Sequence, residues 1–196
     1  MSTTPVGPVN PVGLADQLGR AARVLRAHLG EADLAGKCEL PTPCVEFDVH
    51  RLCEHLFGVL TMSGCAAAKE PLPADLPTAL TEVPWVAFPP VLDRLGAAWA
   101  APGAWEGETT YGSSTYPAPV AGMITIMELT VHGWDLATAT GQSCTADDDV
   151  VATAAAIAAQ LSEGARTNGF FGPETDAPAD ATPLERLLAF TGRKVP

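Results

Sequence analysis

The feature that most constrains the fold of this 196-residue chain is one long, nearly uncharged segment in its second half. A helix is expected to begin at Pro119 and to stop before Gly141, because proline suits the first helical position and glycine the position after the last. Glu128 and His132 are four residues apart and Asp135 follows three later, so these side chains share one face of that helix. The apolar members of the segment also recur at helical spacing: Met123, Ile124, Met127, Val131 and Trp134.

Capping signals and apolar patterns predict further helices on both sides of this segment. These helices are expected to begin at or near Pro11, Asp48, Val91, Asp147 and Thr182. Residues 70–90 carry six prolines and are expected to form a long irregular connection, either a plain crossover or the wall or lid of a site. Thr, Tyr and Ser alternate around Gly112 within residues 105–116, which predicts a short β-hairpin or extended excursion.

The balance of helix and strand signals decides the fold class. Strand signals are weak outside residues 105–116, so the predicted class is all-α, a helical bundle with that short hairpin and additional C-terminal helices. No internal repeat or linker divides the chain, so residues 1–196 are expected to form a single domain. Residues 1–9 are expected to be a flexible tail.

Composition argues against several classes of function. The net charge is −12 with only 11 Lys and Arg, which argues against binding to nucleic acid and to anionic membrane surfaces. The N-terminal residues lack the basic and apolar regions of a secretory signal, and the longest uncharged run is interrupted by glycine and proline. We therefore expect a cytoplasmic protein whose five cysteines are reduced. The sequence is compatible with a monomer and with a homodimer.

Two of the four histidines, His55 and His132, are expected to face the interior. His55 lies on the apolar face of the helix that begins at Asp48, and helical bundles build metal sites from side chains on facing helices. His55, Glu128 and His132 are therefore candidate ligands of zinc or another divalent ion, with a position left for water or substrate. The alternative is a hydrogen-bonded core histidine beside an ordinary Glu–His helix pair. Asp135 is expected either to accept a hydrogen bond that orients a ligand histidine or to be a structural hydrogen-bond partner of a loop.

Three stretches of the sequence carry a family resemblance. The first is an aromatic-Asp-Val-x-x-Leu-x-x-His segment at residues 47–55, and the second is ELTVHGWDLA at residues 128–137. The third is the ending, with FGP at 171–173 and PLERLLAFTGR at 183–193. Together they resemble the DinB-like, mycothiol-dependent maleylpyruvate isomerase N-terminal family, and the ending is similar to a short metal-binding subgroup of unknown activity. The resemblance spans roughly residues 12–194.

The resemblance implies a fold, a metal and a cosubstrate. It implies a DinB-like four-helix bundle in which His55, Glu128 and His132 hold a divalent metal, usually zinc. It also implies that mycothiol, a small bacterial thiol, binds at the open position for S-transfer to an electrophile or for isomerisation. Characterised isomerases carry a separate C-terminal domain, for which a chain ending at Pro196 has no room, so a transferase acting on another electrophile is the expectation. A non-catalytic metal-binding or ligand-binding bundle and a metal-dependent hydrolase are the alternatives.

Overall fold

The computed structural model describes residues 13–73, 76 and 79–195 of the chain. Within these residues the chain forms seven helices: α1 (Leu14–Ala27), α2 (Glu31–Leu34), α3 (Val49–Ala68), α4 (Pro84–Ala100), α5 (Ala118–Thr140), α6 (Asp148–Thr167) and α7 (Pro183–Phe190). The described part also contains one antiparallel sheet of two strands, β1 (Glu108–Tyr111) and β2 (Ser114–Pro117). The predicted tail at residues 1–9 and the predicted helix start at Pro11 lie outside the described residues.

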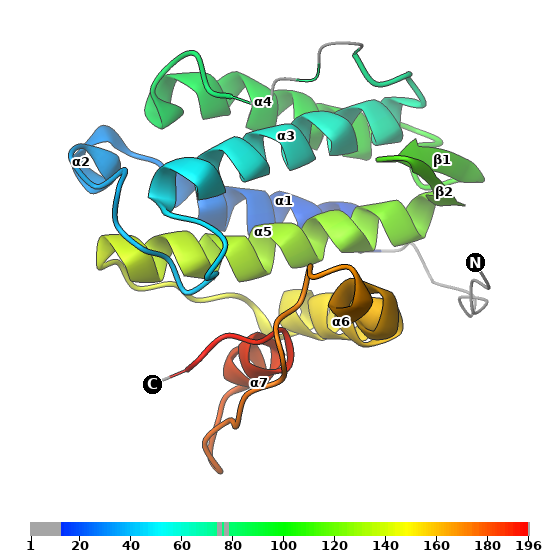
Figure 1. Cartoon of the computed structure of the whole chain (residues 1–196). Helices are drawn as coiled ribbons and strands as arrows, with labels where there is room; N and C mark the ends of the chain where they lie inside the picture. The colour runs from blue at the N-terminus through cyan, green and yellow to red at the C-terminus, as the bar shows by residue number, and fades with distance from the viewer. Residues whose placement is uncertain (1–12, 74–75, 77–78, 196) are drawn as a thin grey trace.

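Four long helices form the bundle that the sequence predicts. α3 packs against α4 and α5, and α1 packs against the same two helices, so the four enclose one core (Figure 1). The fully buried side chains of this core come from all four helices: Leu18, Leu25, Leu52, Leu56, Phe88, Leu95, Trp99 and Ile126. The predicted all-α bundle with a short hairpin and additional C-terminal helices is thereby confirmed.

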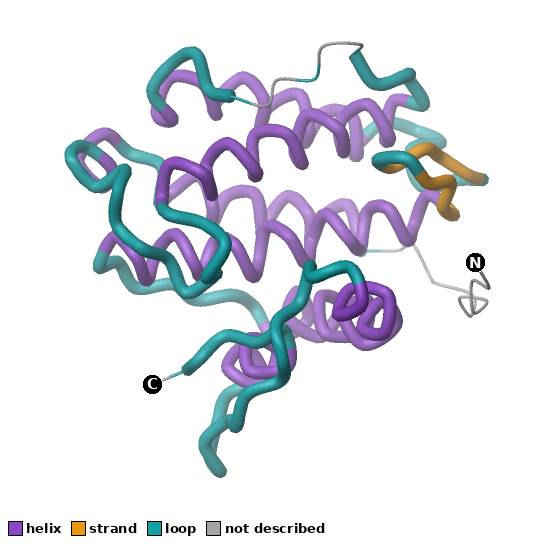
Figure 2. The backbone as a smooth tube through the Cα atoms, in the orientation of Figure 1, coloured by secondary structure: helices purple, strands orange, loops and turns teal. Residues whose placement is uncertain are grey.

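The α5 helix is covered on almost every side. α1 and α3 pack on it within the bundle, α6 packs on it from outside, and α7 packs on α6 (Figure 2). Buried positions make up 18 of its 23 residues, which explains why the segment is apolar around most of its circumference. Polar side chains on such a helix need partners within the protein, because burying an unpaired polar group is costly.

Local capping explains where the helices of the site begin and end. The Asp48 side chain accepts a hydrogen bond from the Arg51 N–H at 2.8 Å and starts α3. Gly141 has a φ of 77°, a left-handed conformation that favours glycine, and it ends α5. Thr182 and Glu185 form a reciprocal capping box at the start of α7. These three boundaries confirm the sequence predictions.

The fourth helix shows where the predictions were wrong. α4 begins at Pro84 instead of Val91, so the connection predicted for residues 70–90 is shorter. Pro89 and Pro90 lie inside the helix, although proline removes an internal hydrogen-bond donor and disfavours helix interiors. Packing of Phe88 and other large side chains of α4 into the core outweighs that penalty. The short α2 helix was not predicted.

The predicted excursion at residues 105–116 is a β-hairpin. β1 pairs with β2 so that Thr109 faces Tyr116 and Tyr111 faces Ser114. The hairpin packs against α3 and α5, across the C-terminal end of α3 and the N-terminal end of α5 (Figure 1). Among the described residues, no helix is both long enough and apolar enough to cross a membrane.

Candidate functional site

Three of the predicted site residues meet between α3 and α5. His55 comes from the first half of α3, whereas Glu128 and His132 are one turn apart on α5. One potential ligand atom from each lies within 4.8 Å of the other two. The Oε2 atom of Glu128 is 3.2 Å from Nε2 of His55 and 3.4 Å from Nε2 of His132. Both imidazoles therefore direct the same ring nitrogen toward one carboxylate oxygen.

The electrostatics of the cluster favour an ionised Glu128. Burial by itself raises the pKa of this carboxyl, but the hydrogen bond with His55 and the charges of His132 and His55 lower it by more. The net result is a Glu128 pKa below its usual range. The side chains become more exposed from His132 at 10% to Glu128 at 20% and His55 at 31%, so the cluster opens to solvent on the α3 side.

Asp135 lies on the other side of the His132 ring. Its Oδ2 atom is 2.9 Å from Nδ1 of His132, and its side chain is fully buried. Arg193, which follows α7, donates from Nη2 to Oδ2 at 2.8 Å and from Nε to Oδ1 at 3.3 Å. Burial raises the pKa of Asp135, but the bonds and charges of His132 and Arg193 outweigh it and hold that pKa low. Asp135 thus has both partners that the sequence left as alternatives, a histidine and a distant segment.

This arrangement assigns the tautomer of His132. An ionised Asp135 accepts only, so Nδ1 of His132 carries the proton and donates. In the neutral ring, Nε2 then presents a lone pair toward Glu128, which is also an acceptor, at 3.4 Å. Two acceptors at that distance attract each other only when a cation, either a proton or a metal ion, is shared between them. The donor set therefore fits a metal ion at this place.

The C-terminal segment that delivers Arg193 depends on a close backbone approach. Gly192 has a φ of 94°, and a Cβ atom built on it would lie 2.7 Å from the Cα of Gly172. The Arg193 carbonyl oxygen accepts a hydrogen bond from the Thr175 hydroxyl at 2.5 Å. Only glycine fits this crossing, so the FGP and TGR motifs of the sequence serve to bring the Arg193 guanidinium to Asp135.

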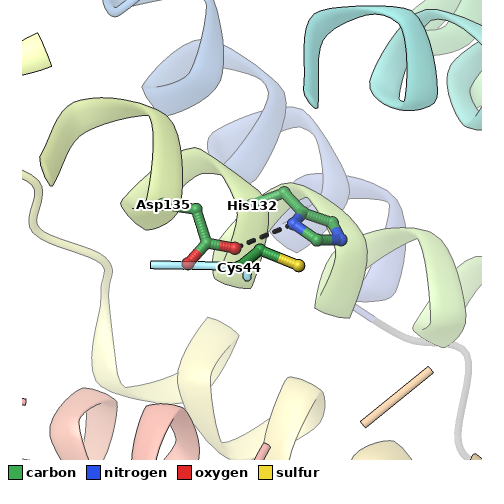
Figure 3. Close-up of side chains that lie close together, drawn as sticks. All are labelled: Cys44, His132 and Asp135. Carbon is green, nitrogen blue, oxygen red and sulfur yellow. Dashed lines mark hydrogen bonds and ion pairs between the residues drawn. The ribbon is translucent and has the colours of Figure 1, made fainter. Parts of the chain in front are cut away.

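The sequence did not indicate the roles of three residues around the cluster, namely Phe47, Cys44 and Arg193. Phe47 stacks on His55, with ring centroids 5.0 Å apart and an interplanar angle of 26°. Cys44 lies beside the hydrogen-bonded pair of His132 and Asp135 (Figure 3), with ligand atoms of the three within 4.8 Å of one another. Burial raises the pKa of the Cys44 thiol, with a smaller contribution from Asp135 and an opposing one from Arg193. The hydrophobic residue before Asp48 was a signal for Phe47, whereas nothing local indicated Arg193.

Comparisons with known proteins identify the family. The family model described as the mycothiol maleylpyruvate isomerase N-terminal domain matches residues 15–137. This chain belongs to that family. Two similar sequences, both named as uncharacterized proteins, come from Mycobacterium tuberculosis strains CDC 1551 / Oshkosh and ATCC 25618 / H37Rv. Each is 32% identical over 157 residues, which are 79% of this chain and 84% of the relative. No solved structure gives a significant match.

The extent of the family match divides the site into two parts. The mycothiol maleylpyruvate isomerase N-terminal domain covers α1 to nearly the end of α5, and with them His55, Glu128, His132 and Asp135. Arg193 lies beyond the matched residues, on the segment after α7. The resemblance to this family is confirmed over residues 15–137, and the buried ion pair of Arg193 with Asp135 links that part of the chain to the C-terminal segment.

Proposed function

We propose that this protein binds a divalent metal ion, most simply zinc, and uses it in a thiol-dependent transfer or isomerisation with mycothiol as the thiol. The observation that carries the proposal is the convergence of His55, Glu128 and His132 within 4.8 Å. Family membership supports the choice of thiol, because the description of the matching family names mycothiol and maleylpyruvate isomerase. A small thiol and an electrophile are the proposed partners.

The donor set suits this chemistry. Two imidazole nitrogens and one carboxylate oxygen are common ligands of catalytic zinc, which keeps a further position for water or substrate. This group has three members among the described residues, and under the proposal an external ligand takes the fourth position of the metal. A metal bound there lowers the pKa of a coordinated thiol and supplies a thiolate near neutral pH.

The residues around the donors would orient the reactants. Asp135 holds His132 in one tautomer, and Arg193 keeps Asp135 ionised. Phe47 covers one face of His55 with an apolar ring. In a transfer, the thiolate sulfur bonds to the electrophilic carbon while the bond to the leaving group breaks. In an isomerisation, the sulfur adds to a C=C bond, rotation follows, and elimination restores the double bond and releases the thiol.

The geometry weighs against the hydrolase alternative. That reading requires Asp135 to act on a metal-bound water, but both of its carboxylate oxygens are engaged by Arg193 and one also by His132. The non-catalytic alternative would be favoured by a fourth protein ligand, and the cluster of His55, Glu128 and His132 has three members among the described residues. We therefore propose thiol-dependent catalysis on two grounds, the donor set of His55, Glu128 and His132 and the family to which the chain belongs.

Elemental analysis of the purified protein tests the metal. Wild type is expected to hold one divalent ion per chain, and His132→Ala to lose it. His50→Ala is the matched control, because His50 is exposed on the same helix as His55 and pairs with Glu54 instead. Equal metal content in wild type and His132→Ala would remove His132 from the site and refute the proposal.

A turnover assay tests the thiol. Metal-loaded wild type is expected to modify members of a panel of unsaturated and halogenated electrophiles only when mycothiol is present. His132→Ala should be inactive with the same panel, and His50→Ala should match wild type. Metal-loaded protein that gives no thiol-dependent product across the panel would refute the catalytic part of the proposal and favour the non-catalytic alternative.

A further inference from the structure

A groove with a volume of about 620 Å³ lies on the side of α5 away from the metal cluster. Trp134 and Thr138 of α5 line it, and because Trp134 is two residues after His132, the two side chains leave the helix about 200° apart. The segment after α7 also lines the groove and runs toward the side of the molecule where α5 ends (Figure 1). Proteins bind small molecules in grooves and cavities of about 300–1,000 Å³, so this groove has the size of a ligand site.

The C-terminal segment places two successive cations in different surroundings. Arg193 reaches the buried Asp135, with Nη2 2.8 Å from Oδ2. The next residue, Lys194, is exposed and lines the groove, and no described residue forms an ion pair with it. The Lys194 ammonium group is therefore available to an anionic ligand, whereas the Arg193 guanidinium is committed to the protein.

The groove also brings together hydrogen-bond donors that the protein itself does not use. The side chains of Trp134, Thr138 and Ser143 line the groove, and none of them makes a hydrogen bond to a described residue. They offer one indole N–H and two hydroxyls. A ligand with oxygen acceptors can bond to these donors without displacing any hydrogen bond of the protein.

The other polar side chains of the lining are either engaged or uncharged. Both the oxygen and the nitrogen of the Gln142 amide have partners within the protein. The Oε2 atom of Glu185 accepts hydrogen bonds from the N–H and the hydroxyl of Thr182, at 2.6 and 2.8 Å, in the capping box of α7. Burial raises the pKa of the Cys144 thiol to about 11, so this group carries no negative charge at neutral pH. Lys194 is thus the charged group of the lining that can pair with a ligand.

We propose that this groove binds a small aromatic carboxylate, with the ring of the ligand against Trp134 and its carboxylate at Lys194. An aromatic ligand suits the indole, because two aromatic rings in contact attract each other beyond the burial of apolar area. Val195 adds a second apolar side chain to the lining. The ammonium group and the hydroxyls of Thr138 and Ser143 supply donors for the carboxylate oxygens. The groove requires no metal, so the proposal does not depend on the proposed function.

A matched pair of probes tests the proposal. The two probes, 2-naphthoate and 2-naphthamide, have the same ring, but only 2-naphthoate carries a charge, and ligand-observed NMR titrations give the dissociation constants. Wild type should bind 2-naphthoate about fivefold more tightly than 2-naphthamide, as expected for an exposed charge pair. Lys194→Gln should remove the difference between the probes. Trp134→Leu should weaken the binding of both probes by about tenfold.

Each of these variants has a control outside the groove. Arg186→Gln removes a cation beside Glu185 on α7, and Trp85→Leu removes a half-buried indole from α4. Neither residue lines the groove, so both controls should bind the two probes as wild type does. Thermal melting checks that Trp134→Leu is folded at the temperature of the titration. Lys194 is exposed, so Lys194→Gln should fold normally and decides the question even if Trp134→Leu does not fold.

His55→Ala separates the groove from the metal cluster, because a carboxylate can also bind a metal ion. This variant should bind 2-naphthoate as tightly as wild type, and loss of binding would assign the probe to the metal and overturn the proposal. The proposal is also overturned if wild type binds the two probes equally, if it binds neither at millimolar concentration, or if Lys194→Gln leaves the preference for 2-naphthoate unchanged. Unchanged binding of both probes to folded Trp134→Leu would overturn it as well. A wild type without metal would refute the proposed function and leave this result unaffected.

Discussion

His132 and His55 face the same carboxylate oxygen from two helices, but their surroundings differ. The His132 side chain is 10% exposed, and its Nδ1 atom is held by Asp135, which is held in turn by Arg193. The His55 side chain is 31% exposed, and its Nδ1 atom has no hydrogen-bond partner among the described residues. Its ring contacts Glu128 through Nε2 and stacks on the ring of Phe47.

The difference indicates a division of labour within the site. A chain of three buried groups fixes the position and tautomer of His132 before any ligand arrives, which is how proteins preorganise metal ligands. His55 lies at the open edge, where the ring can adjust when a metal and a thiol bind. The residues on α5 should therefore determine metal affinity and the stability of the protein. His55 on α3 should determine how readily ligands reach the metal.

Among the substitutions that test this difference between His132 and His55, Arg193→Met should have the largest effect. It leaves Asp135 as a fully buried carboxylate with only His132 as a partner, so the free energy of unfolding should fall by about 3 kcal/mol. Chemical denaturation measures the change. The control is Arg26→Met, which breaks an exposed pair with Asp93 and should cost about 0–1 kcal/mol. Equal losses in the two variants would show that the buried pair of Arg193 and Asp135 stabilises the protein no more than a surface ion pair does.

Asp135→Asn should have the next largest effect. The substitution keeps the shape of the side chain but removes the charge that orients His132 and pairs with Arg193, so zinc affinity should fall by about 10- to 100-fold. Competition with a zinc chelator measures the affinity. An unchanged dissociation constant for zinc would separate Asp135 from the site and remove the contrast between the two histidines.

Gly192→Ala should weaken, through a shift of Arg193, the support that Asp135 gives to His132. The new Cβ atom would lie 2.7 Å from the Gly172 Cα at a residue with a φ of 94°, so we expect a loss of about 2 kcal/mol and weaker zinc binding as Arg193 shifts. Gly103→Ala is the matched control, because its φ is 80° but no atom lies within 4 Å of the added group. It should cost about 1 kcal/mol and leave zinc binding intact. Similar results for both variants would contradict the role given to the crossing.

Phe47→Leu should have the smallest effect. It removes the stacked ring from His55 while keeping an apolar side chain, so zinc affinity should fall by less than about tenfold, which is below the loss in Asp135→Asn. The same chelator competition measures it. A larger loss in Phe47→Leu than in Asp135→Asn would reverse the proposed division of labour.

Helical spacing was enough to predict that His55, Glu128 and His132 would meet. Glu128 and His132 share a face because they are four residues apart, and His55 was the remaining histidine on an apolar helix face. The bundle and its caps followed from equally local signals, such as Asp48 before α3. Whether these residues hold a metal is a prediction that the geometry supports and the metal analysis tests.

The missed features depend on contacts between distant parts of the chain. Arg193 pairs with Asp135 across 58 positions, and its path depends on Gly192 crossing Gly172, which no periodic pattern encodes. The early start of α4 also escaped prediction, because tertiary packing of Phe88 overrides the local penalty of two prolines.

Zinc K-edge X-ray absorption of the purified protein, before and after addition of a thiol, tests the central claim most directly. The account predicts a first shell of nitrogen and oxygen at about 2.0–2.1 Å, including two imidazoles, and the gain of one sulfur at about 2.3 Å when thiol is added. A sulfur ligand already present without added thiol would implicate a cysteine such as Cys44 and contradict an open site. A spectrum that does not change on adding thiol would contradict thiol coordination.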